Sequence, residues 1–155
     1  MKEIKRKSLK EMWPDIEIPV AVLVVWNAVV LFLGVDKMFS NKLFFSIIGW
    51  VISLAAFGYI GYSLARKKRG KEAVRTGAYA GAVAGFAGAI LSIIAYYLVP
   101  GIFNAQIVEA VKAGAEEGTV RLFLQISLFF GLVFAPVVNG LIGALGSFIG
   151  SKIRK

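Results

Sequence analysis

The chain has 155 residues, 58% of them hydrophobic, and a formal net charge of +9. This length suits one domain, and the apolar share exceeds what a water-soluble domain of this size normally needs. The sequence contains neither cysteine nor histidine. Disulfides, thiolate chemistry and cysteine-bound metals are therefore excluded, and the commonest metal ligand and proton shuttle are missing. We expect no cofactor and no metal.

The apolar residues are gathered into four long stretches between charged residues. These uninterrupted stretches are 18–35, 43–65, 76–108 and 122–151. A hydrocarbon core of about 30 Å needs roughly 20 helical residues, with a lower limit near 17. We predict an all-α integral membrane protein, a single domain over 1–155, with transmembrane helices at about 18–35, 43–65, 77–99 and 122–150. The alternative, a soluble bundle of buried helices, would leave too little polar surface to cover it.

The positive charges predict the orientation of these spans. Most of the 18 Lys and Arg residues lie in the amino-terminal arm 1–17, in the loop after the second span and in the carboxy-terminal tail. The other two connections are close to neutral. Because Lys and Arg accumulate in short cytoplasmic loops, three basic segments share the cytoplasmic side only if even numbers of spans separate them. Four spans satisfy this condition and predict a cell-membrane protein with both termini in the cytoplasm.

The first apolar stretch follows a basic region, as the apolar core of a signal peptide does. It is longer than the usual core of about 7–15 residues, and no convincing small-residue cleavage site follows it. We therefore expect the first helix to be retained.

The basic segments also contain the residues that we expect to contact anionic lipid headgroups. These residues are Lys5, Arg6, Lys7, Arg66, Lys67, Lys68 and Arg69. Each Lys or Arg near an anionic membrane surface contributes about 1 kcal/mol to binding. For the arm 1–17, a solvated segment that only sets topology is an equally good interpretation. Nucleic acid could also bind such charges, but topology and the lipid bilayer explain them first.

The third connection, 100–119, is the longest. Asn104 can cap a short helix in which Ile107, Val111 and Ala115 recur every four residues. We predict a short amphipathic helix in this last external loop, lying on the membrane surface. The alternative is that the segment extends the third or the fourth span.

Small residues share one face of the third span and one face of the fourth. At about 100° per residue, each set falls within a narrow stripe. Lipid gives helices no hydrophobic reason to associate, so close approach across small residues is a main source of contact. We predict a glycine zipper that makes these two spans the tightest pair, although a second copy or another protein could be the partner instead. The predicted helix-packing residues are Gly77, Gly81, Gly85, Gly88, Asn139, Gly143, Gly146 and Gly150.

Two residues of the fourth span invite a functional interpretation beside a structural one. Asn139 can hydrogen-bond across the helix contact, which contributes about 0.6–2 kcal/mol in membranes; a ligand or ion contact is the alternative. Pro136 lacks the N–H of a regular helix, so we predict a kink there. Discontinuous helices also form transporter sites, but a simple bend is the more modest interpretation.

The run from Gly58 through Ser63, the basic cluster 66–69 and the glycines from Gly77 to Gly88 together resemble small four-span membrane protein families of unknown function, of the archaeal type. The resemblance lies within the middle third of the chain. It implies four spans, and it brings no activity and no site residues.

Two functions compete on this evidence. The first is a non-enzymatic assembly subunit that associates through its glycine-rich faces, as a homo-oligomer or within a larger membrane complex. The second is a small oligomeric channel or passive transporter. Ion-coupled transport is disfavoured because no predicted span contains a charged residue, and such residues usually mark ion pathways. An enzyme is least expected, and we assign no catalytic residue, because the acidic residues form no constellation for acid-base chemistry.

Overall fold

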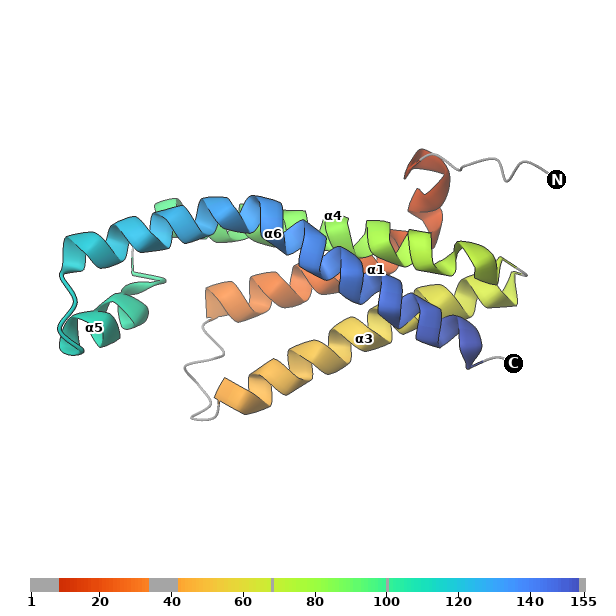
Figure 1. Ribbon diagram of the computed structural model, residues 1–155, viewed down its shortest axis with the longest axis horizontal. Helices are drawn as coiled ribbons and strands as arrows, with labels where there is room; N and C mark the ends of the chain where they lie inside the picture. Colours follow the sequence, from red (N-terminus) through yellow and green to blue (C-terminus); the bar gives the residue numbers. More distant parts are fainter. Residues whose placement is uncertain (1–8, 34–41, 68, 100, 154–155) are drawn as a thin grey trace.

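The computed structural model describes residues 9–33, 42–67, 69–99 and 101–153. Within them the chain is helical and contains no strand (Figure 1). Its elements are α1 (Leu9–Leu33), α3 (Lys42–Arg66), the 3-10 turn η1 (Gly70–Glu72), α4 (Ala73–Leu98), α5 (Asn104–Lys112) and α6 (Glu117–Lys152). Helices α1, α3, α4 and α6 are each long and apolar enough to cross a membrane. The predicted all-α class and the four long apolar helices are confirmed.

Helix α1 begins at Leu9, well before the predicted start of the first span, and it contains Pro14 and Pro19. The prolines cannot donate hydrogen bonds to the carbonyls four residues earlier, and Figure 1 shows α1 bent near its amino-terminal end. Tertiary contacts hold these first turns in place, since Met12 and Ile16 are buried. Burial of side chains in the bundle outweighs the missing backbone bonds.

The connection before α6 contains the short helix α5, as expected, but its details differ from the prediction. Phe103, not Asn104, occupies the cap position, and no side chain caps the helix. The helix ends at Lys112, so Ala115 lies outside it. Because α6 already begins at Glu117, the fourth long helix also extends into this connection. The connection therefore contains both a short helix and an extension of the fourth long helix.

The helices run alternately up and down the bundle. Helix α6 packs on α4 and α3, α1 packs on the same two helices, and α5 contacts α6. The start of α1, the end of α3, the start of α4 and the end of α6 lie at one end of the bundle (Figure 1). The buried core lies in this half, where Ile16 and Leu23 of α1 meet Phe57 and Ile60 of α3 and Ala80 of α4.

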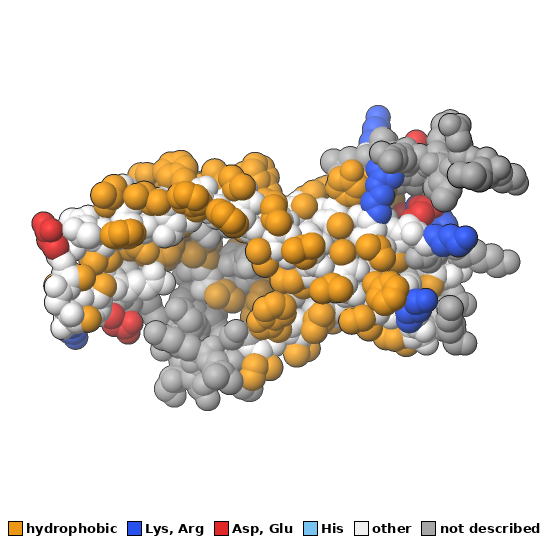
Figure 2. Space-filling model, in the orientation of Figure 1, with side chains coloured by type: hydrophobic (Ala, Val, Ile, Leu, Met, Phe, Trp, Pro, Cys, Tyr) orange, Lys and Arg blue, Asp and Glu red, His pale blue; other side chains and the backbone are white. Residues whose placement is uncertain are grey.

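Charge and apolar surface are separated along the long axis. The end of the bundle formed by Arg66, Lys67, Arg69, Arg75 and Lys152 is here called the basic end, and Figure 2 shows Lys and Arg side chains gathered there. Exposed hydrophobic side chains are spread over the long helices, and they are prominent on the face that Figure 2 shows. So large an exposed apolar surface, on helices of this length, indicates a multi-pass membrane protein.

Candidate functional site

Helices α4 and α6 approach so closely that only glycine fits along part of their contact. A Cβ atom at Gly81 would collide with the carbonyl of Asn139, and one at Gly85 would lie 2.5 Å from the carbonyl oxygen of Ala135. The relation is reciprocal further along, where a Cβ at Gly143 would collide with the backbone of α4. Backbone therefore packs directly on backbone, the geometry that small residues permit between membrane helices.

The glycine face of α6 also packs on a second helix, α3. A Cβ at Gly150 would collide with the carbonyl of Gly58, and one at Gly146 would lie 2.8 Å from the Cβ of Phe57. In the opposite direction, a Cβ at Gly61 would collide with the carbonyl of Ser147. The face of α6 is divided between two neighbours, because its glycines continue past the end of the α4 contact.

Gly88 and Gly77 lie at the two ends of the α4 stripe and have different neighbours. A Cβ at Gly88 would lie 3.3 Å from the amide nitrogen of Asn27, so this glycine faces α1. A Cβ at Gly77 would collide with Gly143 and with the side chain of Ser147. Three of the four predicted glycines of α4 therefore contact α6, and the fourth contacts α1.

Ser147 is a packing residue that the sequence analysis missed. Its hydroxyl donates a hydrogen bond of 2.9 Å to the carbonyl of Phe57 on α3, and its side chain is fully buried. It lies where α3, α4 and α6 meet. A signal was present, because Ser147 follows Gly143 by four residues and continues the same small-residue stripe.

A cavity of about 740 Å³ lies between α1, α4, α6 and the segment that follows α4. It occupies the half of the bundle away from the basic end. Its polar lining side chains are all neutral amides or hydroxyls, and none of its described lining residues is charged: Asn27, Ser92, Gln106, Ser127 and Asn139.

The polar side chains of the cavity are partly bonded to their own helices. Asn139 donates through Nδ2 to the carbonyl of Ala135 at 2.9 Å, within its own helix rather than across the helix contact. The hydroxyls of Ser92 and Ser127 donate in the same way to carbonyls four residues earlier. Each hydroxyl or amide oxygen keeps acceptor capacity for a molecule in the cavity.

Pro136 lies at the boundary between the cavity and the glycine contacts. It follows the lining residue Ala135, and the contacts with α4 and α3 continue from Asn139 toward the basic end. Figure 1 shows that α6 changes direction in its middle. Pro136 has no N–H to donate to the carbonyl of Leu132, so the helix lacks one backbone hydrogen bond where it bends.

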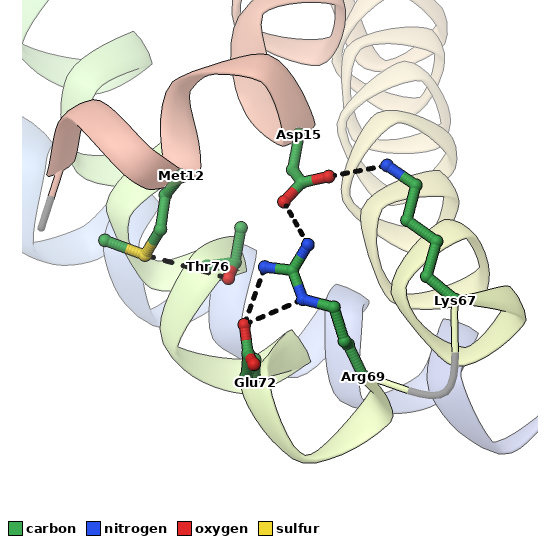
Figure 3. Close-up of polar contacts among 6 residues, drawn as sticks. All are labelled: Met12, Asp15, Lys67, Arg69, Glu72 and Thr76. Carbon is green, nitrogen blue, oxygen red and sulfur yellow. Dashed lines mark hydrogen bonds and ion pairs between the residues drawn. The ribbon is translucent and has the colours of Figure 1, made fainter. Parts of the chain in front are cut away.

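A cluster of charged residues ties α1 to the turn between α3 and α4 (Figure 3). The carboxylate of Asp15 accepts from Lys67 Nζ at 2.8 Å and from Arg69 Nη1 at 3.0 Å. Arg69 also pairs with Glu72 at 2.7 Å. The hydrogen bond to Glu72, together with the charge of Asp15, raises the pKa of Arg69 above its ordinary value. Arg69 is therefore a permanent cation in this cluster.

The structure divides the predicted lipid-contact residues into groups. Lys67 and Arg69 are engaged with acidic side chains, whereas Arg66 is exposed and takes part in none of the ion pairs recorded among the described residues. The remaining predicted positions, Lys5, Arg6, Lys7 and Lys68, lie outside the described residues.

The fold and its surfaces define a class, the multi-pass α-helical membrane protein with four long apolar helices. Among the residues that the structure describes, no group of three or more acidic side chains is placed to hold a metal ion. Comparison with known proteins adds no family, because no protein-family model, curated protein or solved structure matches this chain.

Proposed function

We propose that the protein is a passive transporter of small neutral polar solutes in the cell membrane, with its basic end in the cytoplasm. The single observation that carries this proposal is the cavity of about 740 Å³. Ligand sites in proteins typically have volumes of roughly 300–1,000 Å³ and combine apolar walls with a few polar groups. The orientation is supported by the Lys and Arg side chains of the basic end, because such residues accumulate on the cytoplasmic side.

The lining chemistry supports a neutral solute rather than an ion. An ion stripped of water in the membrane needs charged or multiple strong dipolar partners, and the described lining offers only amides and hydroxyls. Asn27, Asn139 and Gln106 can both donate and accept hydrogen bonds, which suits hydroxylated or amide-containing molecules.

Passage would require the glycine-packed half of the bundle to open, because α4 and α6 are in backbone contact between the cavity and the basic end. The bend at Pro136 separates the cavity-lining half of α6 from its tightly packed half. A hinge at this position would let one half of α6 move while the other stays in place.

The alternative of an assembly subunit stays a prediction. However, the glycine faces that were expected to bind a partner contact helices of the same chain. The glycines of α4 contact α6 and α1, and those of α6 contact α4 and α3. The non-enzymatic character remains part of the proposal. It is supported by the described lining of the cavity, whose polar side chains are amides and hydroxyls rather than titratable groups.

The test is to fill the cavity without disturbing the helix contacts. Gly131 lines the cavity, and a Cβ atom there would meet nothing within 4 Å, so Gly131→Leu places a side chain in open space. Gly118→Leu is the matched control, because Gly118 is exposed on the same helix and does not line the cavity. Flux of glycerol and urea into proteoliposomes would be followed by stopped-flow light scattering.

We expect wild type and Gly118→Leu to accelerate entry of at least one of these solutes over protein-free vesicles, and Gly131→Leu to lose most of that acceleration. Transport through this cavity is contradicted if wild type gives no flux above the lipid background. It is equally contradicted if Gly131→Leu transports as fast as wild type.

A further inference from the structure

A second concave surface lies outside the bundle, between α3 and α6 near the basic end. It is a groove of about 460 Å³ that shares no lining residue with the cavity. The groove is lined by three glycines, which have no side chains to fill it: Gly58, Gly146 and Gly150. Tyr59 and Tyr62 border it. A Cβ atom at Gly58 would meet nothing within 4 Å, so the groove stays open at this position.

The face of α3 that borders the groove continues to a basic residue, Arg66. Arg66 is the last residue of α3 and follows Tyr62 by four residues and Tyr59 by seven, which puts all three on one face of the helix. Arg66 is exposed and has no ion-pair partner among the described residues. Its neighbours Lys67 and Arg69 are held by Asp15, whereas the charge of Arg66 stays available for a ligand in the groove.

We propose that the groove binds one acyl chain of an anionic phospholipid from the cytoplasmic leaflet, and that Arg66 pairs with the phosphate-containing headgroup. An apolar groove on a membrane helix faces hydrocarbon, and aromatic rings such as Tyr59 and Tyr62 are favoured at the headgroup boundary. Basic residues beside clefts between membrane helices are a recurring way to hold anionic headgroups.

Charge favours a lipid over a second copy of the chain as the occupant. Copies inserted in the same direction would bring two basic ends together beside Arg66, and like charges would repel. An anionic headgroup instead neutralises Arg66. The lipid site rests on the proposed orientation, with the basic end in the cytoplasm, and not on transport through the cavity.

The test measures lipid retention by native mass spectrometry. The full chain in mild detergent would be mixed with equal amounts of phosphatidylglycerol and phosphatidylethanolamine that carry the same acyl chains. Gly58→Leu would fill the groove from its open position, and Arg66→Gln would remove only the exposed charge. Gly131→Leu is the matched control, because it makes the same substitution away from the groove.

We expect wild type and Gly131→Leu to retain one phosphatidylglycerol with a preference of about fivefold over phosphatidylethanolamine, the size expected for one cation at an anionic surface. Gly58→Leu should lose the bound lipid. Arg66→Gln, which alters no packed residue, should retain a lipid but bind the two headgroups equally.

The proposal is overturned if Gly58→Leu retains lipid like wild type, or if the headgroup preference survives in Arg66→Gln. It is also overturned if wild type is a lipid-free dimer that Gly58→Leu converts to a monomer, because a second copy would then occupy the groove.

Discussion

Asp15 depends on partners that are distant in the sequence. Its side chain is only 7% exposed, and it pairs with Lys67, which lies 52 residues further along the chain. Because Pro19 leaves the carbonyl of Asp15 without its helical donor, the local backbone is weakened at the same point. The ion pairs therefore hold the first turns of α1 against the turn between α3 and α4.

Replacing Asp15 by Asn should lower the stability of the bundle by about 1–2 kcal/mol, because a charge-assisted hydrogen bond is lost while Lys67 and Arg69 remain partly hydrated. Thermal unfolding in detergent would measure the change. Glu17→Gln removes one negative charge from an exposed position of the same helix and should change stability by less than about 0.5 kcal/mol. Equal effects of the two substitutions would rule out the role given to Asp15.

At the residue scale, the sequence reveals small residues that recur at helical spacing. It does not reveal contacts between segments that are distant in the sequence. The stripe from Gly77 to Gly85 is visible because its members recur every four residues. Ser147 was visible by the same rule, although it was overlooked. The pairing of Asp15 was not visible, since no local pattern connects it to Lys67, 52 residues further along the chain.

At the scale of helices, α4 and α6 can pack this closely because glycines such as Gly81 have no Cβ atom. Gly81→Ala would drive a Cβ into the carbonyl of Asn139 and should destabilise the protein by about 2 kcal/mol or more. Gly131→Ala is the matched control, because its Cβ meets open space and alanine is the better helix former by about 0.5–1 kcal/mol. Unfolding of both variants in detergent would compare them. Similar stabilities would contradict direct backbone contact at Gly81.

The number and apolar character of the four long helices could be predicted from the four uninterrupted apolar stretches, but their limits and partners could not. Helix α1 begins at Leu9 because Met12 and Ile16 find buried positions, which the prolines in the sequence obscured. The glycine face of α6 is divided between α4 and α3 because α6 is longer than either contact. The division of this face between two helices depends on where the helices cross. A stripe of glycines on one helix does not reveal the crossing points.

At the scale of the whole molecule, the account depends on four helices that cross the membrane with the basic end on the cytoplasmic side. The alternation of the helices puts the start of α4 and the end of α6 at that end, and it puts α5 at the other (Figure 1). The cavity would then lie in the outer half of the bilayer and the groove in the inner half.

The absence of cysteine from the sequence allows this claim to be tested with single reporters. The substitutions Lys71→Cys, Ala113→Cys and Ile153→Cys would each be made alone, at exposed positions. Cells would be treated with a membrane-impermeant maleimide before and after permeabilisation. We predict that the Ala113→Cys protein is labelled in intact cells, and that the other two are labelled only after permeabilisation. Labelling of the Ile153→Cys or Lys71→Cys protein from outside intact cells would contradict the account.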